Sequence, residues 1–447
     1  MDNYAAWTLA AEYNRRTVSK SAVKDALRIL AEQAVQQVAV GDHPLEYFGG
    51  ATALYDTRRD EAINKLPAFE KARTELGALQ VVQERYGQSE SERLALQFVY
   101  GFLGTLSEST FGLGIFETAW EAFWEELSEP EWTWLGLANL TNFRSNSLLL
   151  DIGDGITIRG RSFEELAGMG WTEWHLKQLS QEWNERGGSS THVILTEHRL
   201  PKVSDNFVLS DTTGYQKAVR ALLALRLRKD GDIGMGRMWF LRPVAFNLGL
   251  GGYSSTGYPA SFAAAFGNAY TLDEPELSSV RDVYDTLIGY ESARDMAPVN
   301  LDLALRSFSD IYERQTFRYD TRLVDAVTAA EALLGTRTEL SFRLPFRVAA
   351  ILGRDHDDRL DIFKQMRDHY DVRSAVVHGS SLSSRQRQRL EDTRDLRQWL
   401  RQLLVGFLRL TTSSGHSFDT SFFDRSIDIA LVDDTRRSEL RVAMGLE

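Results

Sequence analysis

The sequence feature that most restricts the fold is an amphipathic segment near the C-terminal end, which stops at a histidine and a glycine. Between Asp358 and Val377, apolar side chains recur at spacings of three or four residues, as expected for a helix with one buried face. Gly379 is placed to end this helix in the left-handed conformation that glycine adopts without strain. The sequence therefore predicts a long helix with His378 in its last turn, where the helix dipole favours an imidazolium.

Two side chains in this segment have the chemistry needed to cleave RNA without a metal. His378 can take a proton from a ribose 2′-hydroxyl or give one to the leaving 5′-oxygen. Arg373 can bind the charge of the phosphorane through two N–H groups. Their spacing turns them about 140° apart on an ideal helix, too wide for one face. We expect either a distorted last turn at Gly379 or a second copy that completes the site across a two-fold axis, and we favour the second.

Three segments together resemble a known family. Residues 370–379 read Tyr-Asp-Val-Arg-Ser-Ala-Val-Val-His-Gly, and two apolar runs lie upstream at 326–334 and 341–350. The first segment resembles the Arg-x4-6-His signature of the HEPN superfamily of ribonucleases and is most similar to the Apea-like HEPN family. The upstream runs resemble the first two helices of that family. The resemblance covers roughly residues 317–412, under a quarter of the chain.

The resemblance implies a C-terminal HEPN-like helical bundle that forms a homodimer and places both motifs in a shared cleft. It also implies an endoribonuclease of prokaryotic antiphage defence, which needs no metal and leaves a 2′,3′-cyclic phosphate. By position it assigns phosphate binding to Arg373 and catalysis to His378. Ser374 matches the polar residue that commonly follows the arginine, and Glu331 matches the acidic position of the first helix.

Four further side chains are candidates for supporting roles at this site, namely Glu331, Tyr370, Asp371 and Arg347. Glu331 lies beside the apolar stripe of its predicted helix. There it could orient Arg373 or His378, or form an ordinary ion pair, and both interpretations stay open. Arg347 follows Arg343 by four residues on the next predicted helix, and we favour a surface position for it over a place in the site.

Charge is distributed unevenly along the chain. The net charge is −12, yet residues 318–412 contain 17 Lys+Arg and 13 Asp+Glu. This region is therefore the basic part of an acidic protein, as phosphate binding requires. The substrate-binding candidates are Arg385, Arg387 and Arg389. The alternative, a solvated face paired with the acidic residues at 391, 392 and 395, stays open.

The chain is longer than one hydrophobic core usually supports. We predict a mainly α protein with a smaller α+β module, organised in three regions. Residues 1–140 form a mainly helical N-terminal region, and residues 141–297 an α+β module with Gly-rich loops as a candidate sensor. Residues 298–447 form the HEPN-like nuclease domain and a C-terminal appendix. One long helix from Ser383 to Thr412 is expected to complete the bundle.

Local patterns add detail to the first two regions. A β-hairpin is predicted at 148–159, around Gly-Asp-Gly, with further strands at 192–196 and 207–209 and a helix at 162–186. A tryptophan-rich stretch precedes the hairpin, with Trp120, Trp124, Trp132 and Trp134. These rings could stack on bases, but we favour a place in a core or a domain interface.

The sequence also argues against several classes of site. It contains no cysteine, no run of 18 apolar residues and no signal-peptide pattern. We therefore expect a cytoplasmic protein without disulfides or a membrane span. His175, His192 and His198 lack the spacing of metal ligands, and the glycine clusters at 231–236 and 249–252 lack the Gly-Lys-Ser/Thr ending of a P-loop. No metal and no cofactor are expected.

Two classes of function remain open. The first is an RNA-cleaving homodimer, with tRNA anticodon loops as one candidate substrate and a phage-derived trigger as one candidate regulator. The second is a non-catalytic HEPN dimerisation or ligand-sensing module of a defence or regulatory complex. In that case Arg373 forms a salt bridge with Asp368 or Asp371, and His378 caps helix carbonyls. The two differ in whether Arg373→Ala and His378→Ala abolish an activity while leaving a folded dimer.

Overall fold

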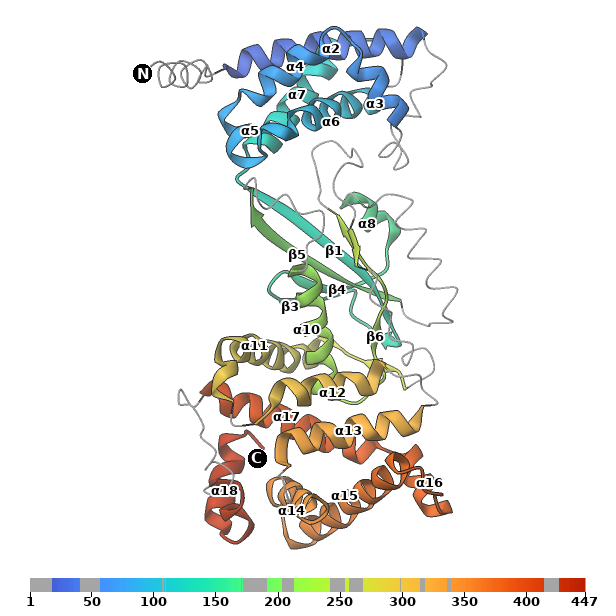
Figure 1. The fold of residues 1–447 in the computed structure, drawn as a ribbon, viewed down its shortest axis with the longest axis vertical. Helices are drawn as coiled ribbons and strands as arrows, with labels where there is room; N and C mark the ends of the chain where they lie inside the picture. The colour runs from blue at the N-terminus through green and yellow to red at the C-terminus, as the bar shows by residue number, and fades with distance from the viewer. Residues whose placement is uncertain are drawn as a thin grey trace, which may run out of the picture.

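The protein is mainly α-helical with a smaller α+β module, as predicted from the sequence. The computed structural model describes residues 18–40, 57–106, 108, 110–169, 171, 191–202, 213–241, 254–256, 268–297, 299–313, 318–335, 339–413 and 426–446. Along the long axis, a layer of N-terminal helices is followed by a sheet and then by a second set of helices that contains the C-terminal end (Figure 1). Within the described residues, every helix is too short or too polar to cross a lipid bilayer.

The N-terminal helices pack around an aromatic core. They are α2 (Lys20–Val40), α3 (Thr57–Asn64), α4 (Phe69–Gly77), α5 (Gln80–Arg85), α6 (Ser91–Gly104) and α7 (Leu113–Ser128). The ring of Phe98 on α6 lies edge-on to Phe116 and Phe123 of α7, at centroid distances of 5.7 and 5.1 Å. Trp120, Trp132 and Trp134 are buried, so the interpretation as core residues is confirmed for these three.

The sheet is built around one long strand that the sequence analysis did not predict. β1 (Glu131–Thr141) pairs antiparallel with β5 (His192–Pro201) and β7 (Met238–Leu241). The strand order is β3-β4-β5-β1-β7-β8, and β6 also pairs with β1. The remaining strands are β2 (Phe143–Arg144), β3 (Leu149–Gly153), β4 (Ile156–Gly160), β6 (Gly234–Met235), β8 (Ser254–Thr256) and β9 (Tyr270–Thr271), with β2 and β9 in a parallel pair.

The predicted hairpin is confirmed as β3 and β4. Gly153, Asp154 and Gly155 all have positive φ values, of 103°, 52° and 73°, the conformation that a Gly-Asp-Gly turn supplies. Of the predicted helix at 162–186, α8 (Phe163–Gly168) is described. Residues 172–190 and the predicted strand at 207–209 lie outside the described residues.

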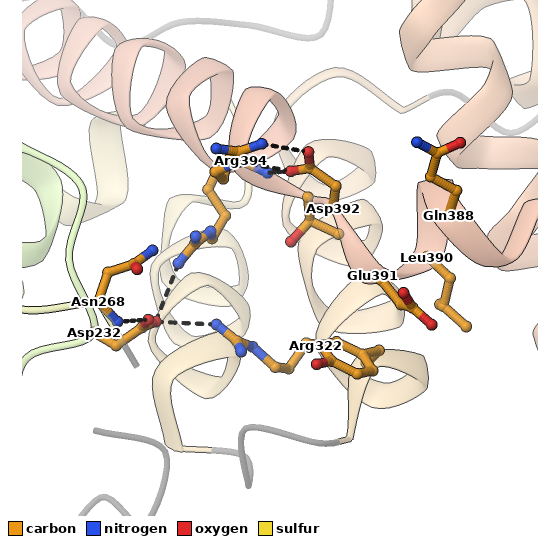
Figure 2. A pocket seen from close by; sticks show the side chains of 11 residues that line it. Asp232, Asn268, Arg322, Gln388, Leu390, Glu391, Asp392 and Arg394 are labelled. Atoms are coloured by element: carbon orange, nitrogen blue, oxygen red, sulfur yellow. Dashed lines mark hydrogen bonds and ion pairs between the residues drawn. The ribbon is translucent and has the colours of Figure 1, made fainter. Parts of the chain in front are cut away.

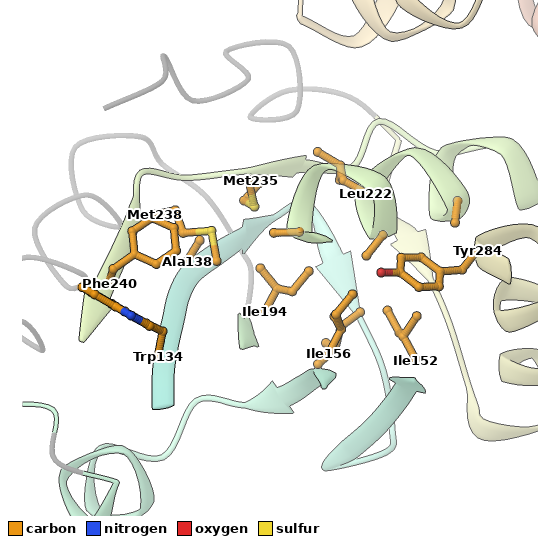
Figure 3. Close-up of a cluster of buried hydrophobic side chains, with 14 of the residues drawn as sticks. Trp134, Ala138, Ile152, Ile156, Ile194, Leu222, Met235, Met238, Phe240 and Tyr284 are labelled. Atoms are coloured by element: carbon orange, nitrogen blue, oxygen red, sulfur yellow. The ribbon is translucent and has the colours of Figure 1, made fainter. Parts of the chain in front are cut away.

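Both faces of the sheet are buried. One face, with Ile156 and Ile194, packs against Leu222 of α10 (Thr213–Arg228) and Tyr284 of α11 (Leu277–Ala293), as Figure 3 shows. The other face forms a separate cluster of Leu135, Leu137, Leu166, Trp171, Val193, Leu195 and Trp239. The sheet is therefore an interior layer of the molecule.

The C-terminal bundle packs directly on this layer. Its helices are α12 (Leu301–Glu313), α13 (Tyr319–Leu334), α14 (Leu340–Leu352), α15 (His356–Val377), α16 (Ser384–Glu391), α17 (Arg394–Ser413) and α18 (Asp434–Ala443). α17 contacts α12 and α13, and it also contacts α10 and α11. Packing is therefore continuous across residue 297.

The expected single helix from Ser383 to Thr412 is wrong, because it breaks into α16 and α17. Asp392 Oδ1 accepts hydrogen bonds from the backbone N–H of Arg394 at 3.2 Å and from its Nε at 2.9 Å, while Oδ2 accepts from Nη2 at 2.7 Å. This pairing ties the end of α16 to the first residue of α17, and α16 packs on α15.

Buried arginines join the bundle to the end of α10. Arg401 Nε donates to the backbone oxygen of Arg226 at 2.9 Å, and its Nη2 donates to the hydroxyl of Tyr312 at 2.7 Å and to Asp230. Arg226 in turn pairs with Glu313 at 2.7 Å. Charged groups buried in this way are stable when each has a partner, so these contacts fix the bundle against the sheet layer.

Candidate functional site

Helix α15 carries the predicted motif, and its side chains divide into two stripes. Asp355 caps the helix by accepting a hydrogen bond from the backbone N–H of Asp358 at 2.9 Å. The buried stripe consists of Ile362, Met366, His369 and Val372. The exposed stripe consists of Leu360, Lys364, Arg367, Asp371 and His378. Because α15 packs against α13 and α14, the first stripe belongs to the bundle core and the second faces solvent.

The helix ends as predicted, at Gly379. The glycine has a φ of 68°; its N–H donates to the carbonyl of Val376 at 3.1 Å, and the N–H of Ser380 donates to the carbonyl of Ala375 at 2.8 Å. These two bonds form a Schellman motif. His378 is the last residue before the left-handed turn, and the motif fixes its backbone while its side chain stays exposed.

Arg373 contacts Glu331 across the α13–α15 interface. Nη2 of the arginine donates to Oε2 of the carboxylate at 3.4 Å, and the two side chains are 24% and 19% exposed. Burial raises the pKa of Glu331, although the nearby guanidinium acts in the opposite direction. The Nε of Arg373 is buried and has no hydrogen-bond partner among the described residues. The hydrogen bond to Glu331 therefore uses only Nη2 of the guanidinium.

Arg373 and His378 lie on different sides of α15. The arginine is directed towards α13 by Glu331, whereas the histidine belongs to the exposed stripe. The helix continues to Val377 and closes in a regular Schellman motif, so the distorted last turn that could have brought the two together is not present. No hydrogen bond joins their side chains within the described residues.

The other motif residues occupy three different environments. Tyr370 is half-buried against the hydrophobic core, and Asp371 is exposed. Ser374 is half-buried, and its backbone oxygen accepts from the N–H of His378 at 3.1 Å. Neither Asp371 nor Asp368 pairs with Arg373 within the described residues, so the alternative salt bridges are replaced by the bond to Glu331.

Arg347 is part of the core. It is 1% exposed, which makes the surface position that we favoured wrong. Its Nε and Nη2 donate to the two carboxylate oxygens of Asp428 at 2.8 and 2.7 Å, and Nη1 donates to the backbone oxygen of Leu334 at 3.0 Å. Such a two-pronged pair fixes the segment after α17 against α14.

Two of the three arginines of α16 contact side chains of α15. Arg385 Nη2 donates to Asp368 at 2.8 Å, and Arg389 Nη1 donates to Gln365 at 3.3 Å. Arg387 is exposed, and its Nε donates to the backbone oxygen of Leu382 at 3.3 Å. Within the described residues, none of the three pairs with the acidic residues at 391, 392 and 395. They therefore form a basic edge beside the motif helix.

His369 is a buried ionisable residue that the sequence analysis overlooked. Its exposed fraction is 0%, and neither ring nitrogen has a hydrogen-bond partner among the described residues. The ring lies edge-on to Trp399 of α17, with centroids 6.3 Å apart. Burial lowers the pKa of His369 to about 3, and Arg389 acts in the same direction. Its place seven residues after Ile362, on the apolar stripe, was the available signal.

The sequence analysis set aside three histidines as metal ligands and two glycine clusters as phosphate-binding loops. His192 and His198 are buried on β5, and His175 lies outside the described residues. Residues 231–236 form the end of a loop and the strand β6, whereas 249–252 are not described. In the part of the chain that the structure describes, no three histidine or acidic side chains lie close enough together to hold a metal ion.

Comparison with known proteins adds no relative. No family model, no curated protein and no solved structure matches this chain.

Proposed function

We propose that this protein is a metal-independent endoribonuclease of prokaryotic antiphage defence, which leaves a 2′,3′-cyclic phosphate on its RNA product. The observation that carries the proposal is the contact between Arg373 and Glu331 beside the capped end of α15. Glu331 holds the guanidinium of Arg373, whose Nε has no partner among the described residues. Five residues later, His378 is exposed and its backbone is fixed by the helix cap. The resemblance of residues 370–379 to the Apea-like HEPN motif supplies the reaction.

The chemistry requires a base, an acid and a group that binds the phosphate. The imidazole of His378 removes the proton of the 2′-hydroxyl, O2′ attacks the phosphorus, and the bond to O5′ breaks as that oxygen takes a proton from the imidazolium of His378. Arg373 donates N–H groups to the non-bridging oxygens, where negative charge develops. Glu331 acts as a positioning residue that holds the arginine from behind.

A second copy of the chain completes the site in this proposal, because Arg373 and His378 face different sides of α15. An exposed aromatic patch on α14 and α15 favours such a contact. Phe342 is 56% exposed and Phe346 40% exposed, and their rings lie 4.6 Å apart. Phe363 of α15 lies 4.8 Å from Phe346. Aromatic groups of this kind are enriched in subunit interfaces.

The basic edge of α16 supplies the contact with RNA. Arg385 and Arg387 are exposed, and Arg389 is half-buried, so their charges reach solvent beside the motif helix. Phosphate contacts of this type contribute affinity without base specificity. We infer a single-stranded substrate such as a tRNA anticodon loop, because its 2′-hydroxyls are accessible. A phage-derived trigger and a cytoplasmic location complete the proposal.

The test is cleavage of total RNA and tRNA by the purified full-length chain in EDTA. The wild type is expected to give discrete fragments with 2′,3′-cyclic phosphate ends, whereas His378→Ala and Arg373→Ala lose at least about 100-fold in rate. His356→Ala is the matched control, because His356 is an exposed histidine on the same helix. If the wild type is inert, the assay is repeated in lysate from infected cells. Equal cleavage by wild type and His378→Ala, or cleavage that needs Mg²⁺, contradicts the proposal.

A non-catalytic dimerisation or ligand-sensing module is the second candidate. The observation that favours it is also the Arg373–Glu331 contact, since an ion pair between α13 and α15 can stabilise the fold without taking part in catalysis. In that case wild type and His378→Ala behave alike in every RNA assay, including lysate from infected cells.

A further inference from the structure

A pocket of about 470 Å³ lies where the sheet layer meets the bundle. Its walls come from the loop after α10, from the start of α13 and from the junction of α16 and α17 (Figure 2). Neither Arg373 nor His378 lines it. The volume is within the range of sites for small organic ligands.

The floor of the pocket carries two buried guanidinium groups. Arg322 Nη2 and Arg397 Nη1 both donate to Oδ1 of Asp232, at 3.1 and 3.2 Å, and the arginines are 7% and 4% exposed. Figure 2 shows Arg322 reaching Asp232 from the side. The Nε–H of each arginine is buried without a partner among the described residues. Arg397 also pairs with Asp230 at 3.5 Å, and Arg401 pairs with the same aspartate. Three guanidinium groups therefore share two carboxylates in this cluster, so the floor suits a further anion.

The N-terminal end of helix α17 adds to the preference of the pocket for an anion. Thr393 and Arg394, at the start of the 20-residue helix α17, line the same pocket. The N-terminal end of a helix carries a partial positive charge and free backbone N–H groups. One of these N–H groups is already taken by Asp392, which also pairs with Arg394 through both carboxylate oxygens. The carboxylate of Asp392 is therefore neutralised and leaves the anion preference of the floor intact.

The rim has a different character, suited to a flat ring with amino groups. Tyr319 exposes 39% of its surface, and Leu390 lines the opening as a second apolar group. Glu391 is exposed and has no ion-pair partner within the described residues. Aromatic faces stack on bases, and a carboxylate accepts hydrogen bonds from an exocyclic amino group.

We propose that this pocket binds a nucleoside monophosphate whose base carries an amino group. The phosphate accepts hydrogen bonds from the free N–H groups of Arg322 and Arg397, and the base lies against Tyr319 and Leu390. The amino group of the base donates to Glu391. The proposal is independent of ribonuclease activity, because it concerns binding at a separate set of residues.

Calorimetric titration of the full-length chain tests it, with adenosine 5′-monophosphate and inosine 5′-monophosphate as a matched pair of probes. Inosine 5′-monophosphate presents a carbonyl oxygen where adenosine 5′-monophosphate presents its amino group. Because Glu391 accepts hydrogen bonds, the affinity for the adenosine compound should be about ten-fold higher. Glu391→Gln should remove this preference. Because Glu391 is exposed, the substitution leaves the fold intact. Inorganic phosphate and adenosine, tested alone, should each bind more weakly than the complete nucleotide.

Two further variants separate this pocket from the proposed nuclease site. Arg322→Lys should weaken binding of the nucleotide at least about ten-fold, because the second N–H group is lost. Arg373→Ala and the surface control Arg436→Gln should leave binding unchanged. The proposal is overturned if neither nucleotide binds saturably, if Glu391→Gln keeps the preference for the amino group, or if binding is lost in Arg373→Ala.

Discussion

Arg373 on α15 donates a hydrogen bond to Glu331 on α13 at 3.4 Å, where both side chains are about three-quarters or more buried. The carboxylate stands behind the guanidinium and leaves its Nε without a partner among the described residues. Two residues 42 positions apart are thus set in contact by the packing of α13 on α15.

Glu331→Gln tests whether this contact positions the arginine for RNA cleavage. Because the pKa of Glu331 is raised by burial, its carboxylate takes up a proton at a higher pH than an ordinary glutamate. As the pH falls, Glu331 of the wild type should become protonated and hold Arg373 less firmly, so that the rate of RNA cleavage decreases. The variant should cleave RNA about ten-fold more slowly at neutral pH and show a flatter acid limb. An unchanged pH–rate profile would leave Glu331 with a structural role alone.

Gly379→Ala should destabilise the end of α15. The φ of 68° costs a residue with a Cβ atom about 1 kcal/mol, while the space around that atom is open, with nothing within 4 Å. The measurement is the free energy of unfolding in urea. Gly114→Ala is the control, since its Cβ also meets nothing within 4 Å but Gly114 lies in the first turn of α7 without a positive φ. An equal effect of the two substitutions would contradict the conformational explanation.

His369 should make the protein sensitive to acid. In the unfolded chain its imidazole takes a proton below about pH 6.5, whereas in the folded chain burial lowers its pKa to about 3. The unfolded state therefore binds the proton first as the pH falls, and stability is lost between these two values. Down to pH 5 the loss is about 2 kcal/mol.

The variant His369→Leu removes this proton-binding site. Unfolding in urea at pH 7.5 and pH 5.0 should show a smaller difference for the variant than for the wild type. Three charged residues act on His369, and they are the same in both proteins: Asp368, Arg389 and Asp392. Equal differences would show that another group is responsible for the acid sensitivity.

Phe346→Asp should separate the proposed dimer. The substitution places a charge in the exposed aromatic patch with Phe342 and Phe363, where a dimer contact would bury it at a cost of several kcal/mol. Sedimentation velocity should change from a dimer to a monomer, and RNA cleavage should fall with it. Val432→Asp, at a residue that is 88% exposed, is the control and should stay dimeric. A monomeric wild type would overturn the idea of a site shared between two copies.

Local patterns were sufficient to predict the helices that hold the motif. The apolar spacing of α13 and α15 and the glycine at 379 act within one or two turns, and the structure confirms the capped helix end. The break before Arg394 was missed because Asp392 binds both the backbone N–H and the side chain of Arg394. In the sequence, Asp392 and Arg394 are indistinguishable from the charged residues of a solvent-exposed helix face.

Longer-range features gave no local signal. β1 carries buried residues on both of its faces, so that the alternation typical of a half-exposed strand is absent. The role of Arg347 depends on Asp428, 81 residues away, and that of Arg322 depends on Asp232, 90 residues away. Such pairs arise from tertiary packing, which the spacing of residues within a helix does not reveal.

The contact between the exposed Asp230 and the buried Arg401 has a consequence for synthesis of the chain. The two residues are 171 positions apart, a distance that a ribosome covers in about 10–30 s. Throughout this interval the aspartate and the end of α10 are without their final partner. The sheet layer therefore emerges from the ribosome long before helix α17, and the surface of α10 and α11 that α17 covers stays open to solvent during that delay.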